Sequence, residues 1–126
     1  TDMLERLCEQ YYIYEGTENL QPKVLKEVKS IIQDLRTDAK TLKGLEQTLD
    51  RNCGNLVSRL REQLPKMKDE DIRLFIFVAS GFSSTTISTI LEKDKGIVYN
   101  RIWRLKSKID GSDAPDKEDF LAALGR

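Results

Sequence analysis

Apolar residues recur at steps of three and four along the N-terminal half of the chain, which is the spacing of an α-helix that buries one face. Three such stripes predict helices over residues 4–14, 22–35 and 38–64. The third is the longest, and we expect it to stay continuous across Gly44 and Gly54. Charged helices with apolar stripes predict a packed bundle, a coiled-coil dimer, or both, and the pattern does not choose between them.

The second half opens with an acidic cluster and then a thick apolar stretch. Residues 69–71 are Asp, Glu and Asp, which suit a helix N-terminus because unpaired N–H groups there favour carboxylates. A metal site or a general-acid site is an alternative interpretation of three adjacent acids. Neighbouring positions on a helix do not face each other, however, so we favour the interpretation as a helix start. Gly81 is typical of the residue that ends such a helix.

Two helices joined by a short turn follow. Ser83 or Ser84 suits the N-cap of a short helix, which a charged turn then ends. Asp94 suits the N-cap of a longer helix over 95–109, and a last short helix is expected to dock on the domain from about Pro115. This order predicts a helix-turn-helix, in which the second helix enters the major groove of DNA.

Helix 95–109 is amphipathic and basic. Turned at 100° per residue, it has one apolar face and, opposite, a face of polar and aromatic residues. The apolar face holds Val98, Ile102, Leu105 and Ile109, and the opposite face holds Gly96, Asn100, Trp103, Arg104 and Ser107. Asparagine matches adenine and arginine matches guanine through paired hydrogen bonds, which favours a DNA contact. An exposed tryptophan is equally typical of a protein interface.

Charge is unevenly distributed in a chain whose formal net charge is +0. Residues 66–109 hold 9 basic and 5 acidic side chains, whereas residues 110–126 hold 2 and 5. Residues 1–65 are nearly balanced, with 10 and 11. The basic block therefore coincides with the predicted helix-turn-helix.

The composition argues against several other functions. The chain has no histidine, and its two cysteines, Cys8 and Cys53, suit neither a disulfide framework nor a zinc site, so we expect buried free thiols. We find no residue set for catalysis, a metal or a cofactor, and expect a protein that is not an enzyme. Free thiols are typical of a reducing compartment, so we expect a cytoplasmic location. No apolar run is long enough for a membrane span. Because the chain starts at Thr1, we expect it to be a piece of a longer protein.

Two segments carry a motif. They are residues 81–91, GFSSTTISTIL, and residues 98–109, VYNRIWRLKSKI. Together they resemble the output domain of LuxR-type (NarL/FixJ-type) response regulators, whose pattern reads roughly GxSNKEIAxxLxIS, two residues, then TVKxHxxxIxxKL, and the spacing matches without a gap. The second segment is similar to the C-terminal part of Bacteroides-type regulators with a tetratricopeptide region and a membrane helix. The resemblance is strong over 65–109 and looser over 1–64.

The resemblance implies an all-α chain in which a helical, often coiled-coil connector over 1–64 precedes a helix-turn-helix domain over 65–126. It implies that one set of side chains faces the bases: Lys95, Gly96, Tyr99, Asn100 and Trp103. A second set is expected to contact phosphates, from the flanks of the helix and from the hydroxyl groups that start the preceding one: Ser83, Ser84, Thr85, Thr86, Arg104, Lys106 and Lys108. The chain departs from the pattern at Lys93, Ile97, Tyr99 and Arg101 among other positions, where these residues replace an apolar residue, a threonine, a lysine and a histidine.

We therefore expect the DNA-binding output domain of a transcriptional regulator, with double-stranded DNA as its partner. A homodimer would present two recognition helices about one DNA turn apart. The alternative is a protein-interaction module of the same shape, which uses Tyr99, Ile102 and Trp103 against its own N-terminal domain or RNA polymerase. The expected cytoplasmic location also fits a chain that is the cytoplasmic part of a membrane-anchored protein.

Overall fold

The computed structural model describes residue 30, residues 33–34 and residues 38–125, and these form helices and loops without a strand. The helices are α3 (Ala39–Asn52), α4 (Leu56–Gln63), α5 (Asp69–Ala79), α6 (Ser84–Leu91), α7 (Lys95–Asp110) and α8 (Lys117–Ala123). The all-α prediction is confirmed for this part of the chain. The helix predicted over 4–14, nearly all of the one over 22–35, and Cys8 lie outside the described residues.

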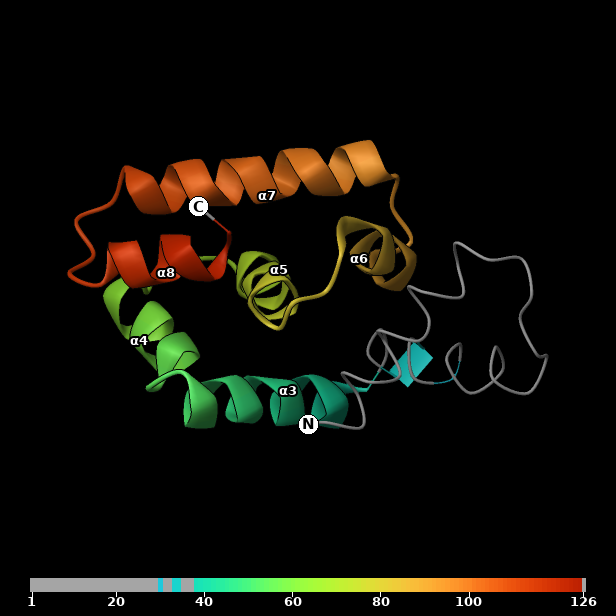
Figure 1. Ribbon diagram of the computed structural model, residues 1–126, viewed down its shortest axis with the longest axis horizontal. Coiled ribbons are helices and arrows are strands. Elements are labelled where there is room, and N and C mark those ends of the chain that lie inside the picture. Colours follow the sequence, from blue (N-terminus) through green and yellow to red (C-terminus); the bar gives the residue numbers. More distant parts are fainter. Residues whose placement is uncertain (1–29, 31–32, 35–37, 126) are drawn as a thin grey trace.

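The central helix is α5. It contacts α3, α4 and α7, and Figure 1 shows it end-on between α3 on one side and α7 on the other. Residues 74–77 are all buried, as expected of a helix with neighbours on several sides. Two of them make ring contacts, since Phe77 stacks on Phe82 with centroids 5.8 Å apart and Phe75 meets Phe120 edge-on at 6.2 Å.

The prediction of one continuous helix over 38–64 is wrong. The chain leaves the helix at Cys53, and Gly54 and Asn55 then adopt left-handed φ angles of +62° and +59° before α4 begins. Cys53 is a free thiol, as predicted, but it is exposed rather than buried, because it lies where the chain turns away from the core. The predicted apolar stripe is confirmed, because it continues from α3 into α4, and the break changes only the direction of the helix axis. Its buried members are Leu45, Leu49, Leu56 and Leu60.

Helices α3 and α4 share one hydrophobic core with α5 to α8. A polar clasp also joins α4 to the start of α8. Gln63 accepts the Asp116 backbone N–H at 2.9 Å through Oε1 and donates Nε2 to the Asp116 carboxylate at 2.6 Å. Arg59 pairs with Asp116 at 3.0 Å and with Asp119 at 2.9 Å. The domain boundary after residue 64 and the coiled coil stay predictions.

Candidate nucleic-acid interface

Helices α6 and α7 form a contacting pair joined by three residues. Ser83 is the N-cap of α6, and its hydroxyl oxygen accepts the Thr86 N–H at 3.1 Å. Glu92 ends α6 in a left-handed conformation, with φ +54°. Asp94 is the N-cap residue of α7, although its side chain makes no capping hydrogen bond. The predicted order of short helix, turn and longer basic helix is therefore present.

One face of α7 is anchored in the core. Val98, Leu105 and Ile109 are at most 1% exposed. They pack in the same cluster as Ile87 and Ile90 of α6, which are fully buried. Because α7 is held along its length, the direction of its opposite face is set by the packing rather than by the helix alone.

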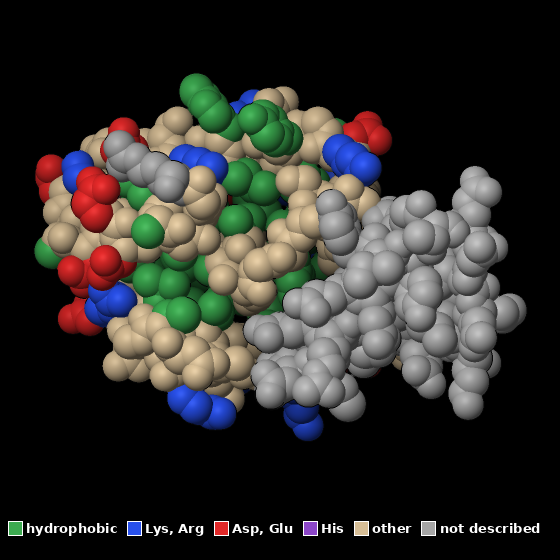
Figure 2. Space-filling model, in the orientation of Figure 1, with side chains coloured by type: hydrophobic (Ala, Val, Ile, Leu, Met, Phe, Trp, Pro, Cys, Tyr) green, Lys and Arg blue, Asp and Glu red, His purple; other side chains and the backbone are tan. Residues whose placement is uncertain are grey.

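The opposite face of α7 is open, and all five predicted base-facing residues lie on the exposed part of this helix. The two aromatic side chains are the most prominent, with Tyr99 67% and Trp103 64% exposed. Large hydrophobic side chains project from the surface above α7 in Figure 2. Ile97, which is 43% exposed, lies on the side of Asn100 opposite to Tyr99 and Trp103.

The residues predicted to contact phosphates differ in their exposure and in their contacts within the chain. Arg104 is exposed and Lys106 half-buried, whereas Lys108 is exposed but ion-paired with Asp71 of α5 at 3.0 Å. At the start of α6, Thr86 is only 2% exposed and its hydroxyl hydrogen-bonds to that of Ser83. That hydroxyl therefore serves the cap and is not available to a phosphate. Ser83, Ser84 and Thr85 are half-buried around the same helix end.

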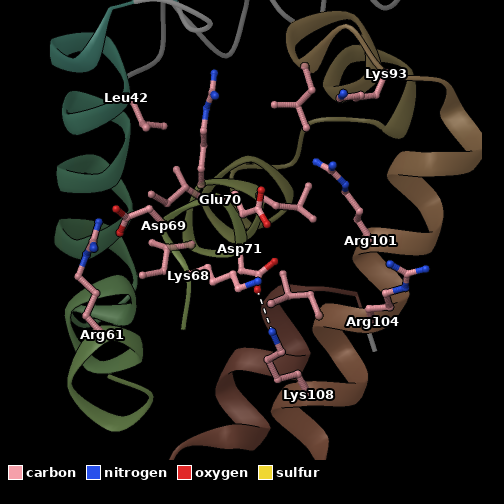
Figure 3. Close-up of a pocket in the computed structure, with 16 residues that line it drawn as sticks. Leu42, Arg61, Lys68, Asp69, Glu70, Asp71, Lys93, Arg101, Arg104 and Lys108 are labelled. Carbon is pink, nitrogen blue, oxygen red and sulfur yellow. Dashed lines mark hydrogen bonds and ion pairs between the residues drawn. The ribbon is translucent and has the colours of Figure 1, made fainter. Parts of the chain in front are cut away.

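A hollow of about 1010 Å³ lies beside α7, between its Arg101 flank and the first turn of α5 (Figure 3). Seven basic and three acidic side chains line it, so its net charge is positive. Arg101 extends from α7 into this space, and Glu70 and Asp71 face it from α5. Arg61 borders it from α4, and a hydrogen bond from Arg61 to Glu46 raises the pKa of the guanidinium above its usual value.

Five of the seven cations of this hollow were missing from the predicted site, and two of them, Lys93 and Arg101, lie in α7 or in the turn before it. A signal for Arg101 is present in the sequence, since Arg101, Arg104 and Lys108 recur at steps of three and four on one flank of the helix. Lys93 has no such signal, because it lies in the turn, and only the packing of α6 on α7 brings it to the same hollow.

Within the described part of the chain, no group of acidic, cysteine or histidine side chains is arranged to hold a metal ion. The same residues include no helix with the length and apolar character needed to cross a bilayer. Comparison of the chain with models of protein families, with curated proteins and with solved structures gives no match in any of the three.

Proposed function

We propose that this chain is a DNA-binding module of the LuxR-type helix-turn-helix kind, which inserts α7 into the major groove as its recognition helix. The observation that carries the proposal is the orientation of α7: its apolar face is buried, while Lys95, Asn100 and Trp103 are exposed on the remainder. A helix is about 10–12 Å across with its side chains, and the major groove is about 12 Å wide, so the open face would meet base edges.

Side chains on this face suit two kinds of contact. Asn100 is exposed near the middle of α7, where an amide can bond both N6 and N7 of adenine. Lys95, which the resemblance places among the base-facing residues, lies with Lys106 on the flank that also carries Tyr99. We therefore assign both ammonium groups to the phosphates of one groove wall. The proposed partner is double-stranded DNA, bound by a two-fold dimer when two half-sites lie about one turn apart.

Fluorescence anisotropy with labelled duplexes of mixed sequence at low salt tests the proposal. We expect binding that Lys106→Glu weakens roughly tenfold on every duplex, because a phosphate contact carries no sequence information. Asn100→Ala should instead change which duplexes are preferred, by about 1–3 kcal/mol at one base pair. Failure of the wild-type chain to bind any duplex at low salt, in a sample shown to be dimeric, would exclude the proposal.

A second candidate is a protein-interaction module, and the exposure of Tyr99 and Trp103 favours it. RNA polymerase is the partner we would test. The two candidates differ in the effect of Trp103→Ala, which should abolish polymerase binding under the second and should leave the salt dependence of duplex binding unchanged under the first.

A further inference from the structure

The flank of α7 that faces α5 carries a row of cations separate from the open face. Arg101 follows Asn100 and is turned by about 100° from it, which directs its side chain into the hollow shown in Figure 3. Arg104 and Lys108 continue the row toward the end of α7, and Lys93 lies beyond its beginning. From Arg101 to Lys108 the row is about 10 Å long.

Most of this positive charge is not neutralised by an ion pair within the described part of the chain. Lys108 is paired with Asp71 at 3.0 Å. Lys93, Arg101 and Arg104 have no ion-pair partner among the described residues. Glu70 faces the same space from α5 without pairing with any of them. The hollow therefore presents cations along one wall, while the Asp69 and Glu70 carboxylates line it from the first turn of α5.

We infer that this hollow holds the phosphate backbone of one DNA strand, through Lys93, Arg101 and Arg104, an inference that rests on the proposed function. When a helix fills the major groove, its two flanks meet the two phosphate walls of that groove. Lys95 and Lys106 lie on one flank, and the cations of the hollow lie on the other. A row of cations suits a polymer with regularly repeated negative charge better than it suits a single anion.

The Glu70 carboxylate should oppose DNA binding at the hollow, whereas the cations favour it. A backbone seated in the hollow lies near this carboxylate, which repels it. Removal of the carboxylate should therefore strengthen binding, whereas removal of the cations should weaken it. A uniform effect of net charge would not depend on whether the altered side chain lines the hollow.

The experiment measures duplex affinity against salt concentration for the 126-residue chain and for matched variants. In the first pair, Lys93→Gln with Arg101→Gln is compared with Lys40→Gln and Arg51→Gln, whose residues are exposed on α3, on the opposite side of α5 from α7 (Figure 1). The hollow variant should bind about tenfold more weakly, and the slope of log affinity against log salt should become shallower by about two. The α3 variant should keep the wild-type slope.

In the second pair, Glu70→Gln is compared with Glu118→Gln, which removes a carboxylate from the same first-turn position on α8, outside the hollow. Glu70→Gln should strengthen duplex binding a few-fold, and Glu118→Gln should not. Arg101→Lys, which keeps the charge at this half-buried position, should retain most of the affinity and show that Arg101→Gln acts through charge rather than folding.

Equal slopes for the two double variants would overturn the inference. If Lys106→Glu and Asn100→Ala still change binding in that case, only the phosphate contact at the hollow is refuted and the proposed function stands. If the wild-type chain, in a sample shown to be dimeric, binds no duplex at low salt, the proposed function fails, and this inference fails with it.

Discussion

At the scale of single residues, Asp50 shows how the break between α3 and α4 is stabilised. Asn55 is the N-cap residue of α4 but makes no side-chain capping bond. Asp50, from the last turn of α3, takes that role: its Oδ1 accepts the Val57 N–H at 2.7 Å and its Oδ2 accepts the Ser58 hydroxyl at 2.6 Å. No cap pattern at the start of α4 could have predicted this, since the cap belongs to the preceding helix.

We expect Asp50→Ala to lower the free energy of unfolding by about 1–2 kcal/mol, because it leaves N–H groups at the start of α4 without an acceptor. Urea unfolding followed by circular dichroism measures the change. Asp50→Asn, which keeps one acceptor oxygen, should lose less, and Asp113→Ala in the exposed loop after α7 should lose little. An Asp50→Ala midpoint equal to that of the wild type would contradict the capping role.

Asp116 gives the clasp between α4 and α8 a dependence on pH. The hydrogen bond from Gln63, and then the bond from Arg59, lower the pKa of this carboxyl below its usual value near 4. A carboxyl whose folded pKa is depressed stabilises the fold above the unfolded pKa, and this contribution is lost as the pH falls through the folded pKa.

We therefore expect Asp116→Asn to be less stable than the wild type at pH 7, with a difference that shrinks as the pH falls below about 4. Thermal midpoints measured from pH 7 downward test this. Asp113→Asn provides the matched control, which should show a small difference that does not follow this course. A difference between wild type and Asp116→Asn that stays constant across the range would refute the role of the clasp.

At the scale of elements, α8 is short, yet it completes the core. Phe120 is fully buried and meets Phe75 of α5 edge-on, with ring planes at 84°. The prediction of a last short helix that docks on the domain is confirmed, since Phe120, Leu121 and Leu124 are all buried. The sequence placed its start near Pro115, and α8 begins at Lys117.

Phe120→Ala should destabilise the chain by about 3–5 kcal/mol, because it removes a buried ring and leaves a cavity between α5 and α8. Guanidinium unfolding measures the loss, and Phe120→Leu should cost clearly less. Ala122→Ser on the exposed side of the same helix is the control and should change little. A Phe120→Ala variant that unfolds like the control would show that α8 contributes little to the core.

At the scale of the whole molecule, a formal net charge of +0 conceals a local charge separation. The flanks of α7 and the adjoining turn gather the basic side chains, and the segment after α7 is acidic. Attraction to DNA would therefore come from one surface and act over a short range, since exposed charges are screened beyond about 8 Å at physiological ionic strength.

If Lys93, Lys95, Arg101, Arg104 and Lys106 each meet a phosphate, log affinity should fall against log salt with a slope of about −4 to −5 per bound chain. Anisotropy titrations at several salt concentrations give this slope directly. A slope near zero would mean that the duplex does not meet these cations, whatever the affinity at one salt concentration.

The sequence by itself determined the helices, their buried faces and several of their ends. Helical periodicity is a local property, because residues three and four apart share a face wherever the helix packs, and caps such as Asp38 and Ser83 act on N–H groups two or three residues away. The tertiary structure alone decided the break at Gly54 and the exposure of Cys53. It also decided which flank of α7 faces α5, and hence the Lys108–Asp71 pair and the hollow that joins Lys93 to Arg101. The Lys108–Asp71 pair and the hollow depend on packing between separate helices, which no local pattern specifies. The break depends on Asp50, whose carboxylate accepts bonds from Val57 and Ser58 across it.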